Sequence, residues 1–431
     1  MMTMARRFSF LLTLLPLFFA TTKITMAHVA IVTSKSWVPF QLMEEVKKRG
    51  EKLLVITDTP PQIPQDFSLE DINSGVVSFC LIPILNEANK QFIHLCAKSV
   101  QASAIFSMEE QLLELTMPDG LYFRDKLLMK ERLLKNGYDK ITPFLGNLHS
   151  PQLVKEFIKT YDFPVILKPK DEMGADGIII VKSQEEFEQL EETKDISNSS
   201  LFMEKYMSGE VYHVDGVVLD GEILFVRPSR YSLGMFSFYQ EGIAAYSIEL
   251  DGEKKKEILQ ETQEVIKAME YERGIFHLEF IRNEKGELHF MEIAARVGGG
   301  MINNRAAISF NVDFHRINSQ LFLGGEDSEI KKMLLDKTEE LEKKPLYVAD
   351  LEVPLHPENS DNNSCIFRHF DLKEKTLNEM STLYWHQAPN EGELVKMEKF
   401  PTIKFLFQGH DLRAIEREVE FITHEIIYQC D

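Results

Sequence analysis

The sequence predicts an α/β protein built from several packed units, and three observations support this prediction. The chain has 431 residues, more than one ordinary domain uses, which suggests two to four units with substantial cores. Hydrophobic residues make up 44% of the chain and charged residues 27%, values typical of a folded globular protein. From Met26 onward, strand-type runs alternate with helix-type runs, as an α/β layer requires.

The charge balance and the cysteines narrow the classes of partner. The formal net charge is -20, which excludes binding to a nucleic-acid backbone through bulk charge, so small-molecule partners are expected. The cysteines show no metal-ligand spacing and are too few for a disulfide framework in so long a chain. We expect them to be core or surface thiols; they are Cys80, Cys96, Cys365 and Cys430.

Residues 1–25 form either a signal-like leader or an upstream stretch before a start at Met26. Two arginines precede an apolar run from Phe8 to Ala20, as in a signal peptide. The run is too short for a comfortable membrane span, which needs about 20 apolar residues, so no stable membrane association is expected. The alternative is a start at Met26, since MAHVAIVTS leads directly into a buried-type strand, and the compartment argued for below favours this start.

Residues 26–120 predict an N-terminal α/β domain. HVAIVTS and KLLVITD are strand-type runs, PFQLMEEVKKRG between them is a helix closed by Gly50, and VVSFCLIPIL is a further strand. The turn from Ser34 to Trp37 contains no glycine, which excludes a dinucleotide fingerprint. A helical stretch from Arg124 to Asn136 follows, so the first boundary is placed near residue 120.

The segment FPVILKPKDEMGADGIIIVKS, residues 163–183, predicts a hairpin with a glycine-containing loop. Gly174 and Gly177 let the backbone approach an anion closely, so that successive N–H groups cradle phosphate oxygens. Lys168, at the end of the first strand, adds a positive charge to the same phosphates. A purely structural hairpin is the alternative, because many hairpins contain two glycines and a lysine.

The segment GIFHLEFIRNEKGELHFMEIAARVGGG, residues 274–300, predicts a second hairpin. A two-residue loop at Lys285 and Gly286 places Glu279 directly opposite Glu292 on one face, whereas a three-residue loop would break this pairing. Two facing carboxylates among apolar neighbours need a positive partner, and Mg²⁺ binds such oxygens together with substrate phosphates. A solvated outer face is the alternative.

Arg296 follows this hairpin and precedes three glycines. Its guanidinium can bind carboxylate or phosphate oxygens near the metal, and the glycines leave room for a substrate. A surface ion pair before a flexible linker is the alternative.

These elements, in this order, resemble the ATP-grasp superfamily, and specifically its carboxylate-amine ligases of the L-amino-acid ligase type. The resemblance implies an ATP-grasp domain over residues 121–325, in two subdomains of about 121–200 and 201–325. Residues 26–120 are similar to the family's pre-grasp domain. The remaining residues, 326–431, are expected to form a small C-terminal α/β domain.

The resemblance also implies ATP and Mg²⁺, or Mn²⁺, as cofactors. It assigns Lys126 and Lys168 to the phosphates and makes the loop with Gly174 and Gly177 mobile. LFMEKYMSGEVYHVDG is similar to the adenine hinge. In this hinge the resemblance implies that Glu204 contacts the adenine, that the backbone of Lys205, Tyr206 and Met207 contacts its ring, and that Glu210 contacts the ribose. Further along the chain it implies that Glu279 and Glu292 bind the metal and that Arg296 binds the intermediate. Two departures stand out: Ala294 replaces an asparagine frequent in the family, and Ala175 a small hydroxyl residue.

The implied activity is amide formation through an acyl phosphate, with a small-molecule carboxylate and amine as substrates. Lys168 and Arg296 then act as catalytic groups, and His277 is a substrate or base contact unless it is a packed histidine. Because ATP is a cytoplasmic substrate, a cytoplasmic enzyme is expected. A carboxylase or purine-pathway enzyme of the superfamily and a non-catalytic nucleotide-binding module remain alternatives. The oligomeric state, a homodimer included, is left open.

Overall fold

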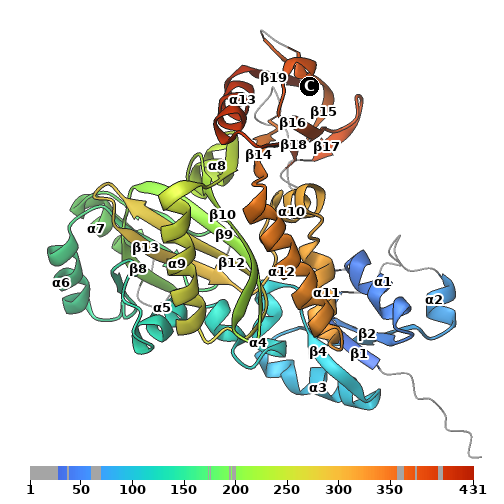
Figure 1. Ribbon diagram of the computed structural model, residues 1–431. Helices are drawn as coiled ribbons and strands as arrows, with labels where there is room; N and C mark the ends of the chain where they lie inside the picture. Colours follow the sequence, from blue (N-terminus) through green and yellow to red (C-terminus); the bar gives the residue numbers. More distant parts are fainter. Residues whose placement is uncertain are drawn as a thin grey trace, which may run out of the picture.

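The computed structural model describes residues 28–35, 38–59, 69–172, 174, 176–193, 196, 200–356, 364–373, 376–396 and 401–431. Within these residues the strands form four sheets (Figure 1). The predicted leader, the proposed start at Met26 and Ala175 lie outside the described residues.

The N-terminal sheet is parallel, as the sequence predicts, with the order β3-β2-β1-β4. Its strands are β1 (His28–Thr33), β2 (Lys52–Thr57), β3 (Val77–Leu81) and β4 (Ala102–Phe106). The helices around it are α1 (Phe40–Lys48), α2 (Leu69–Asn73), α3 (Lys90–Ser99) and α4 (Leu113–Thr116). Alternate residues of β1 and β2 pack against α1 on one face and against α3 and α4 on the other. The strands therefore read as continuous apolar runs, because both faces are covered.

A small antiparallel sheet follows, with the order β5-β8-β6-β7. Its strands are β5 (Phe144–Leu145), β6 (Val165–Pro169), β7 (Ile179–Val181) and β8 (Leu201–Lys205), accompanied by α5 (Lys126–Lys135), α6 (Pro151–Tyr161) and α7 (Gln184–Thr193). The β6–β7 pairing confirms the predicted hairpin. Asp125 caps α5 by accepting from the N–H groups of Leu127 and Leu128, which fixes the start of the helix at Lys126.

The largest sheet has eight strands in the order β13-β12-β9-β10-β11-β14-β18-β16. Its strands are β9 (Gly209–Leu219), β10 (Glu222–Tyr231), β11 (Ala245–Glu249), β12 (Arg273–Asn283), β13 (Leu288–Ala294), β14 (Tyr347–Pro354), β16 (Leu383–Gln387) and β18 (Thr402–Gly409). The helices between them are α8 (Met235–Glu241), α9 (Gly252–Ala268), α10 (Ile302–Phe310), α11 (Phe314–Leu323) and α12 (Asp327–Lys343). The strands beyond residue 326 thus continue the sheet begun by β9 to β13.

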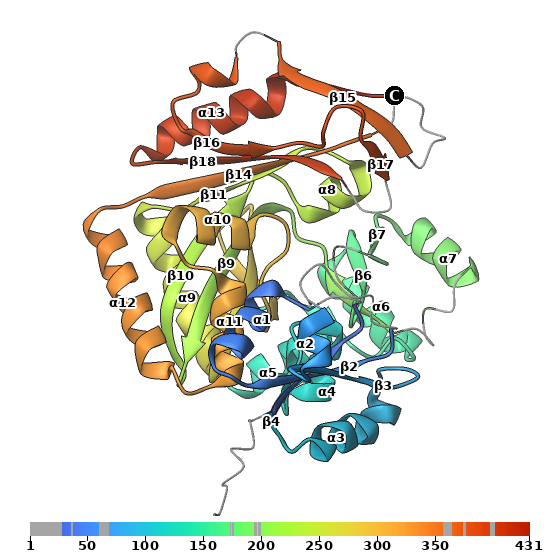
Figure 2. The ribbon, with the colours of Figure 1, turned by 90° about the vertical axis from the view of Figure 1, so that its right-hand side faces the viewer.

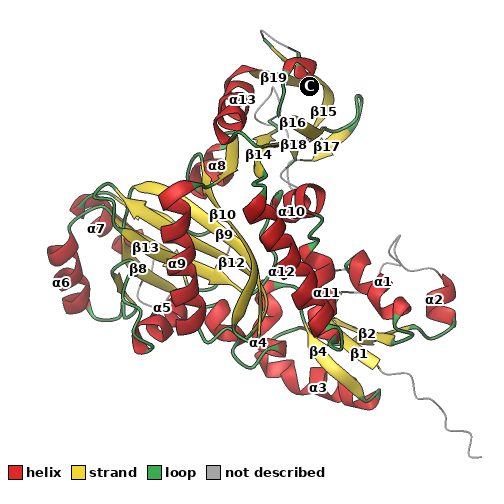
Figure 3. Cartoon of the chain, in the orientation of Figure 1, coloured by secondary structure: helices red, strands yellow, loops and turns green. Residues whose placement is uncertain are grey.

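The two faces of this sheet have different cover. Tyr212, Val214 and Leu278 point into a core beneath α5 and α9. Val217 and Ile275 point to the opposite face, where α10, α11 and α12 pack. Figure 3 shows α9 on one side of the sheet and these three helices on the other. Because side chains alternate along a strand, the odd-numbered residues further along β9 and β12 share the second face.

The C-terminal part adds a further layer. A three-stranded sheet, order β17-β15-β19, contains β15 (Ser364–Leu372), β17 (Leu394–Lys396) and β19 (Ile426–Cys430). Together with α13 (Leu412–Glu425) it packs against β11, β14 and β18. Figures 1 and 2 show this layer and the N-terminal sheet at opposite ends of the molecule. Among the helices of the described ranges, none has the length and apolar character that a membrane span requires.

The expectation of free thiols is wrong. Cys80 is joined to Cys96 and Cys365 to Cys430, which leaves no cysteine free. The partners are 16 and 65 residues apart in the chain. Cysteine count alone therefore misled, because pairing depends on which strands and helices the fold brings together.

Candidate active site

A cavity of about 450 Å³ opens between the small sheet and the eight-stranded sheet. Its walls come from the β6–β7 hairpin, the chain from β8 into β9, the segment around α8, and the ends of β12, β13 and β14. A volume of this size suits a small-molecule ligand. Most of the predicted site residues line it, although they are scattered over 170 positions of sequence; they are Lys126, Lys168, Gly174, Glu204, Lys205, Tyr206, Met207, His277, Glu279, Glu292 and Arg296.

Glu204 lies between two lysines at one end of the cavity. Its Oε2 is 2.6 Å from Nζ of Lys168, and its Oε1 is 2.8 Å from Nζ of Lys130. The side chains of Glu204 and Lys130 are each 1% exposed. Burial opposes ionisation of Glu204, but the two lysines outweigh it and lower its pKa. Glu204 therefore acts as the counter-ion of Lys168, and its predicted contact with adenine stays a prediction.

Glu279 and Glu292 face each other across β12 and β13, as predicted. Burial raises the pKa of Glu292, but Lys126 and Lys168 more than reverse this and lower it overall. Nζ of Lys126 lies 3.2 Å from Oε2 of Glu292. The carboxylate oxygens offered here are the ligands that Mg²⁺ prefers, so the residues present fit the predicted metal.

The pairing of the two glutamates arises differently from the prediction. Asn283 and Glu287 pair through their backbones and Gly286 bonds back to Asn283, so the loop has three residues, not two. A β-bulge then leaves Met291 without a cross-strand partner and restores the register at Glu279 and Glu292. The bulge is linked to Glu204 through Lys130, because Nζ of Lys130 donates to the carbonyl oxygen of Met291 at 3.3 Å and lies 2.8 Å from Glu204.

Arg296 is held by the N-terminal domain. Its Nε donates to Oε2 of Glu110 at 2.5 Å, and its Nη1 donates to the carbonyl of Val297 at 2.9 Å. Glu110 is buried and also accepts from Arg124 at 3.0 Å. Glu110, from the N-terminal part of the chain, therefore reaches the cavity lining and fixes the direction of the arginine.

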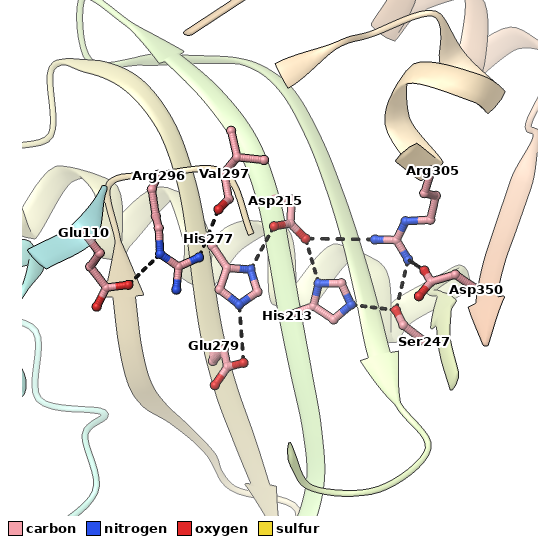
Figure 4. A network of polar contacts seen from close by, with 10 residues as sticks. All are labelled: Glu110, His213, Asp215, Ser247, His277, Glu279, Arg296, Val297, Arg305 and Asp350. Atoms are coloured by element: carbon pink, nitrogen blue, oxygen red, sulfur yellow. Dashed lines mark hydrogen bonds and ion pairs between the residues drawn. The ribbon is translucent and has the colours of Figure 1, made fainter. Parts of the chain in front are cut away.

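A chain of buried polar groups runs along the cavity floor on β9 and β12 (Figure 4). Asp215 contacts Nδ1 of His277 at 2.8 Å and Nδ1 of His213 at 2.7 Å. Nε2 of His277 lies 3.4 Å from Oε1 of Glu279. Burial lowers the pKa of His277, but Asp215 and Glu279 outweigh burial and raise it to about 10. At His213, by contrast, burial outweighs Asp215 and lowers the pKa.

The network continues to the far wall of the cavity. Nε2 of His213 lies 2.6 Å from Oγ of Ser247, which accepts from Arg305 at 2.9 Å. Arg305 also donates to Asp350 at 3.1 Å. Glu352 lines the cavity two residues further along β14, on the same face as Asp350. Two carboxylates therefore lie on this wall, and the buried Arg305 contacts one of them, Asp350, from outside the cavity lining.

Two predicted residues lie apart from the cavity lining. Gly177 has φ +68 and packs against Pro169, where it shapes the β6–β7 loop. Glu210 is exposed on β9 and pairs with Lys254 at 2.8 Å. Their predicted contacts with the phosphates and the ribose are not tested by this arrangement.

Several residues in or directly behind the cavity lining were not predicted from the sequence. Lys130 follows Lys126 by one helical turn on α5, and that spacing was a usable signal. His213 and Asp215 alternate within VYHVDG, which places both on one strand face. Their meeting with His277 depends on the pairing of β9 with β12, and no local pattern reveals that pairing.

The fold and the cavity agree with an ATP-grasp domain, a class of domain that the comparison with known families identifies in this chain. Residues 161–305 match the model of the ATP-grasp domain. The structure is similar to that of an L-amino acid ligase from Bacillus licheniformis, with a TM-score of 0.64 and 17% identity over 94% of this chain and 99% of that one. The chain therefore contains an ATP-grasp domain and has the ATP-grasp fold.

Within this class, two curated relatives are ligases. The L-arginine-specific L-amino acid ligase of Bacillus subtilis is 30% identical over 199 residues, which are 45% of this chain and 48% of that protein. Dapdiamide A synthase of Enterobacter agglomerans is 27% identical over 187 residues, 41% of this chain and 43% of that protein. The matches span about half the length of these relatives.

Proposed function

We propose that this protein is an ATP-dependent carboxylate-amine ligase that joins small molecules, such as amino acids, through an acyl phosphate. One observation carries the proposal: a single cavity in an ATP-grasp fold brings together two lysines, two facing glutamates and an arginine. The ligase relatives support the C–N bond-forming reaction. The cofactors are then ATP and Mg²⁺.

The charge of each side chain suggests its role in the reaction. Lys126 and Lys168 bind the phosphates, and the backbone from Lys205 to Met207 reads the adenine edge. Glu279 and Glu292 would hold Mg²⁺, and the bound ion would supply positive charge next to the transferred phosphoryl group. A carboxylate oxygen of the substrate attacks the γ-phosphorus of ATP, the bond from this phosphorus to the oxygen that bridges to the β-phosphate breaks, ADP leaves, and the acyl phosphate forms.

The second half of the reaction forms the amide. The amine nitrogen attacks the acyl carbon, the C–N bond forms, the C–O bond to phosphate breaks, and the amine releases a proton. Arg296, directed by Glu110, stabilises the oxyanion that forms on the acyl oxygen. The hairpin loop around Gly174 excludes water from the acyl phosphate.

We infer further that one substrate carries a cationic group. Asp350 and Glu352 line the far wall of the cavity. Arg305 is shared between Asp350, Ser247 and Asp215, and Lys404 pairs with Glu352 only at 3.8 Å, so these two cations do not fully balance the carboxylates. A guanidinium or ammonium group of the substrate would offset this negative charge. The name of the Bacillus subtilis relative, which specifies L-arginine, supports the same substrate class.

The compartment also belongs to the proposal. The use of ATP supports the cytoplasm, whereas two disulfides are typical of an oxidising compartment. Cell fractionation, combined with thiol labelling before and after reduction, decides between them. Protein found in the exported fraction with its N-terminus at His28 would overturn the cytoplasmic proposal.

The test of function is phosphate release from Mg²⁺-ATP, screened against single amino acids and pairs, with product masses recorded. We expect release only with a pair, a product lighter than the two substrates by one water, and better turnover with arginine or lysine than with citrulline or norleucine. Release that requires bicarbonate or a phosphoribosyl substrate would point to another branch of the superfamily. ATP binding without turnover would indicate a nucleotide-binding module, the alternative that Ala294 favours.

A further inference from the structure

Asp215 occupies an unusual position between two histidines. It lies on β9 opposite His277 on β12, and its side chain is 2% exposed. An ionised carboxylate only accepts hydrogen bonds, so each of its oxygens requires a donor. The two histidines hold the pKa of Asp215 below its usual value against the effect of burial. Both contacts are therefore N–H to carboxylate hydrogen bonds, with Nδ1 of His277 and Nδ1 of His213 as the donors.

This assignment determines which nitrogen of each ring points away from Asp215. A histidine that donates from Nδ1 presents Nε2 on its other side. For His277 that nitrogen faces Glu279 at 3.4 Å, at the edge of the cavity. For His213 it faces Oγ of Ser247 at 2.6 Å, away from the metal ligands (Figure 4). One carboxylate thus sets the orientation of both rings.

An independent observation links this hydrogen bond to Arg296. A Cβ atom built on Gly298 would lie 2.4 Å from Cδ1 of Ile302, 2.8 Å from Oδ1 of Asp215 and 2.9 Å from Nδ1 of His277. These distances are shorter than van der Waals contact, so the chain after Arg296 passes over the Asp215–His277 bond only because residue 298 is glycine. The position of that bond therefore supports the segment that carries Arg296.

We propose that Asp215 is a positioning residue of the ligase: it orients His277 toward Glu279 and supports the Arg296 segment through its contact with Gly298. The inference rests on the proposed function and deepens it. Asp215 itself does not act on the substrate. It acts through His277 and the backbone that follows Arg296, as outer groups do when they orient the ligands of a metal site.

The first experiment needs no activity. The full chain, labelled with ¹⁵N-histidine, is compared by ring-nitrogen NMR with the variants Asp215→Asn and Glu249→Gln. Glu249 is a matched control, because it is a buried carboxylate of the same sheet that pairs with Arg227 and does not line the cavity. We expect two exchange-protected Nδ1–H signals, assigned with His213→Gln and His277→Gln. Both should change in Asp215→Asn and persist in Glu249→Gln; unchanged signals in Asp215→Asn would overturn the proposal.

The second experiment uses the substrate pair found by the phosphate-release screen. Asp215→Asn should lower kcat about 10- to 100-fold and leave the KM for ATP unchanged. In a His277→Gln background, the loss caused by Asp215→Asn should be smaller than in the wild type, because part of its effect runs through His277. Full additivity, or a loss no larger than that in Glu249→Gln, would contradict the assignment.

Gly298→Ala tests the same idea with the carboxylate intact, and it also covers the case in which Asp215→Asn does not fold. The added methyl group should displace the Arg296 segment and lower kcat while ATP still binds. Wild-type kcat in Gly298→Ala would overturn the link to Arg296. If the wild type forms no product with any pair, the proposed function fails, and the NMR comparison still decides the role of Asp215.

Discussion

Glu204 has the most constrained charge in the site. It balances Lys168, which faces the cavity, and Lys130, which is buried beneath it. Burial, helped by the charge of Lys168, lowers the pKa of Lys130 despite Glu204. At Lys168 the nearby glutamates, Glu204 foremost, outweigh burial and raise the pKa. The glutamate therefore keeps Lys168, the lysine proposed to bind phosphate, charged and directed.

Replacing Glu204 with glutamine should destabilise the protein strongly. Two lysines would remain in a buried position without their counter-ion, which costs about 3 kcal/mol of unfolding free energy or more. Urea unfolding followed by circular dichroism measures the change. The matched control is Glu264→Gln on the exposed side of α9, which should stay within about 0.5 kcal/mol of the wild type. Equal losses in both variants would show that the cluster is not the cause.

Asp350 makes the stability of the folded protein depend on pH. Burial raises its pKa from 3.8 to about 7; Glu352 and Asp215 act in the same direction, and Arg305 opposes them. Between these pH values the folded protein keeps a proton that the unfolded chain has lost, so Asp350 lowers stability as pH rises through this window.

Asp350→Asn should remove this loss, because asparagine keeps the acceptor for Arg305 and does not titrate. The stability of the variant relative to the wild type should improve by up to about 1.4 kcal/mol per pH unit across the window and stay level above it. Urea titrations of the ligand-free protein at a series of pH values measure the difference. A difference that is constant with pH would mean that Asp350 titrates normally.

At the scale of elements, the hairpin of β6 and β7 positions Lys168. Gly177 has φ +68, and a Cβ there would lie 2.7 Å from Cγ of Pro169, the residue that follows Lys168. Gly286, in the β12–β13 loop, has φ +85 and no atom near its Cβ position. The two glycines share an unusual backbone conformation and differ in steric surroundings.

The pair offers a matched comparison. Gly286→Ala should lose about 1 kcal/mol of stability from its backbone conformation alone and keep the wild-type KM for ATP. Gly177→Ala should lose more, because the methyl group also pushes on Pro169, and it should raise the KM for ATP by moving Lys168. Thermal unfolding and the KM for ATP of both variants test this prediction. The same KM for ATP in the two variants would show that the β6–β7 loop does not affect nucleotide binding.

The elements also show what the sequence can predict. The strands, α5 and the pairing of Glu279 with Glu292 follow from local patterns of apolar residues and turns. The loop of the hairpin was predicted one residue too short, and the bulge at Met291 compensated for the error. A bulge leaves no clear local signal, so the correct pairing was reached through an incorrect loop.

Long-range pairings account for what the sequence analysis missed. Asp215 and His277 are 62 residues apart, and Glu110 is 186 residues from Arg296. The continuation of the large sheet by β14 likewise joins distant segments. The strand order decides these contacts, whereas each strand's own sequence specifies only its two faces. The division of the chain into domains stays a prediction for the same reason.

At the scale of the whole molecule, the C-terminal layer packs against β11, β14 and β18, and residues of β11 and β14 also line the cavity. The Cys365–Cys430 disulfide joins β15 to β19 within this layer. Its reduction releases a loop of 65 residues and should cost about 4 kcal/mol of stability in the chain-entropy account.

Hydrogen exchange with and without dithiothreitol locates this effect. We expect faster exchange in β15, β17 and β19 after reduction and unchanged exchange in β9 and β12, which lie in a separate core. The variant Cys80→Ser with Cys96→Ser is the control, because it keeps the C-terminal disulfide and should retain the response. Faster exchange throughout the protein would show that the layers unfold as one unit.

The proposed ligase activates a substrate carboxylate by phosphoryl transfer. The most direct test uses a carboxylate substrate labelled with ¹⁸O, Mg²⁺-ATP and the amine, followed by mass spectrometry of the released phosphate. An acyl phosphate requires one carboxylate oxygen to become a phosphate oxygen, so we expect one ¹⁸O atom per phosphate released. Unlabelled phosphate formed alongside the amide product would contradict the mechanism.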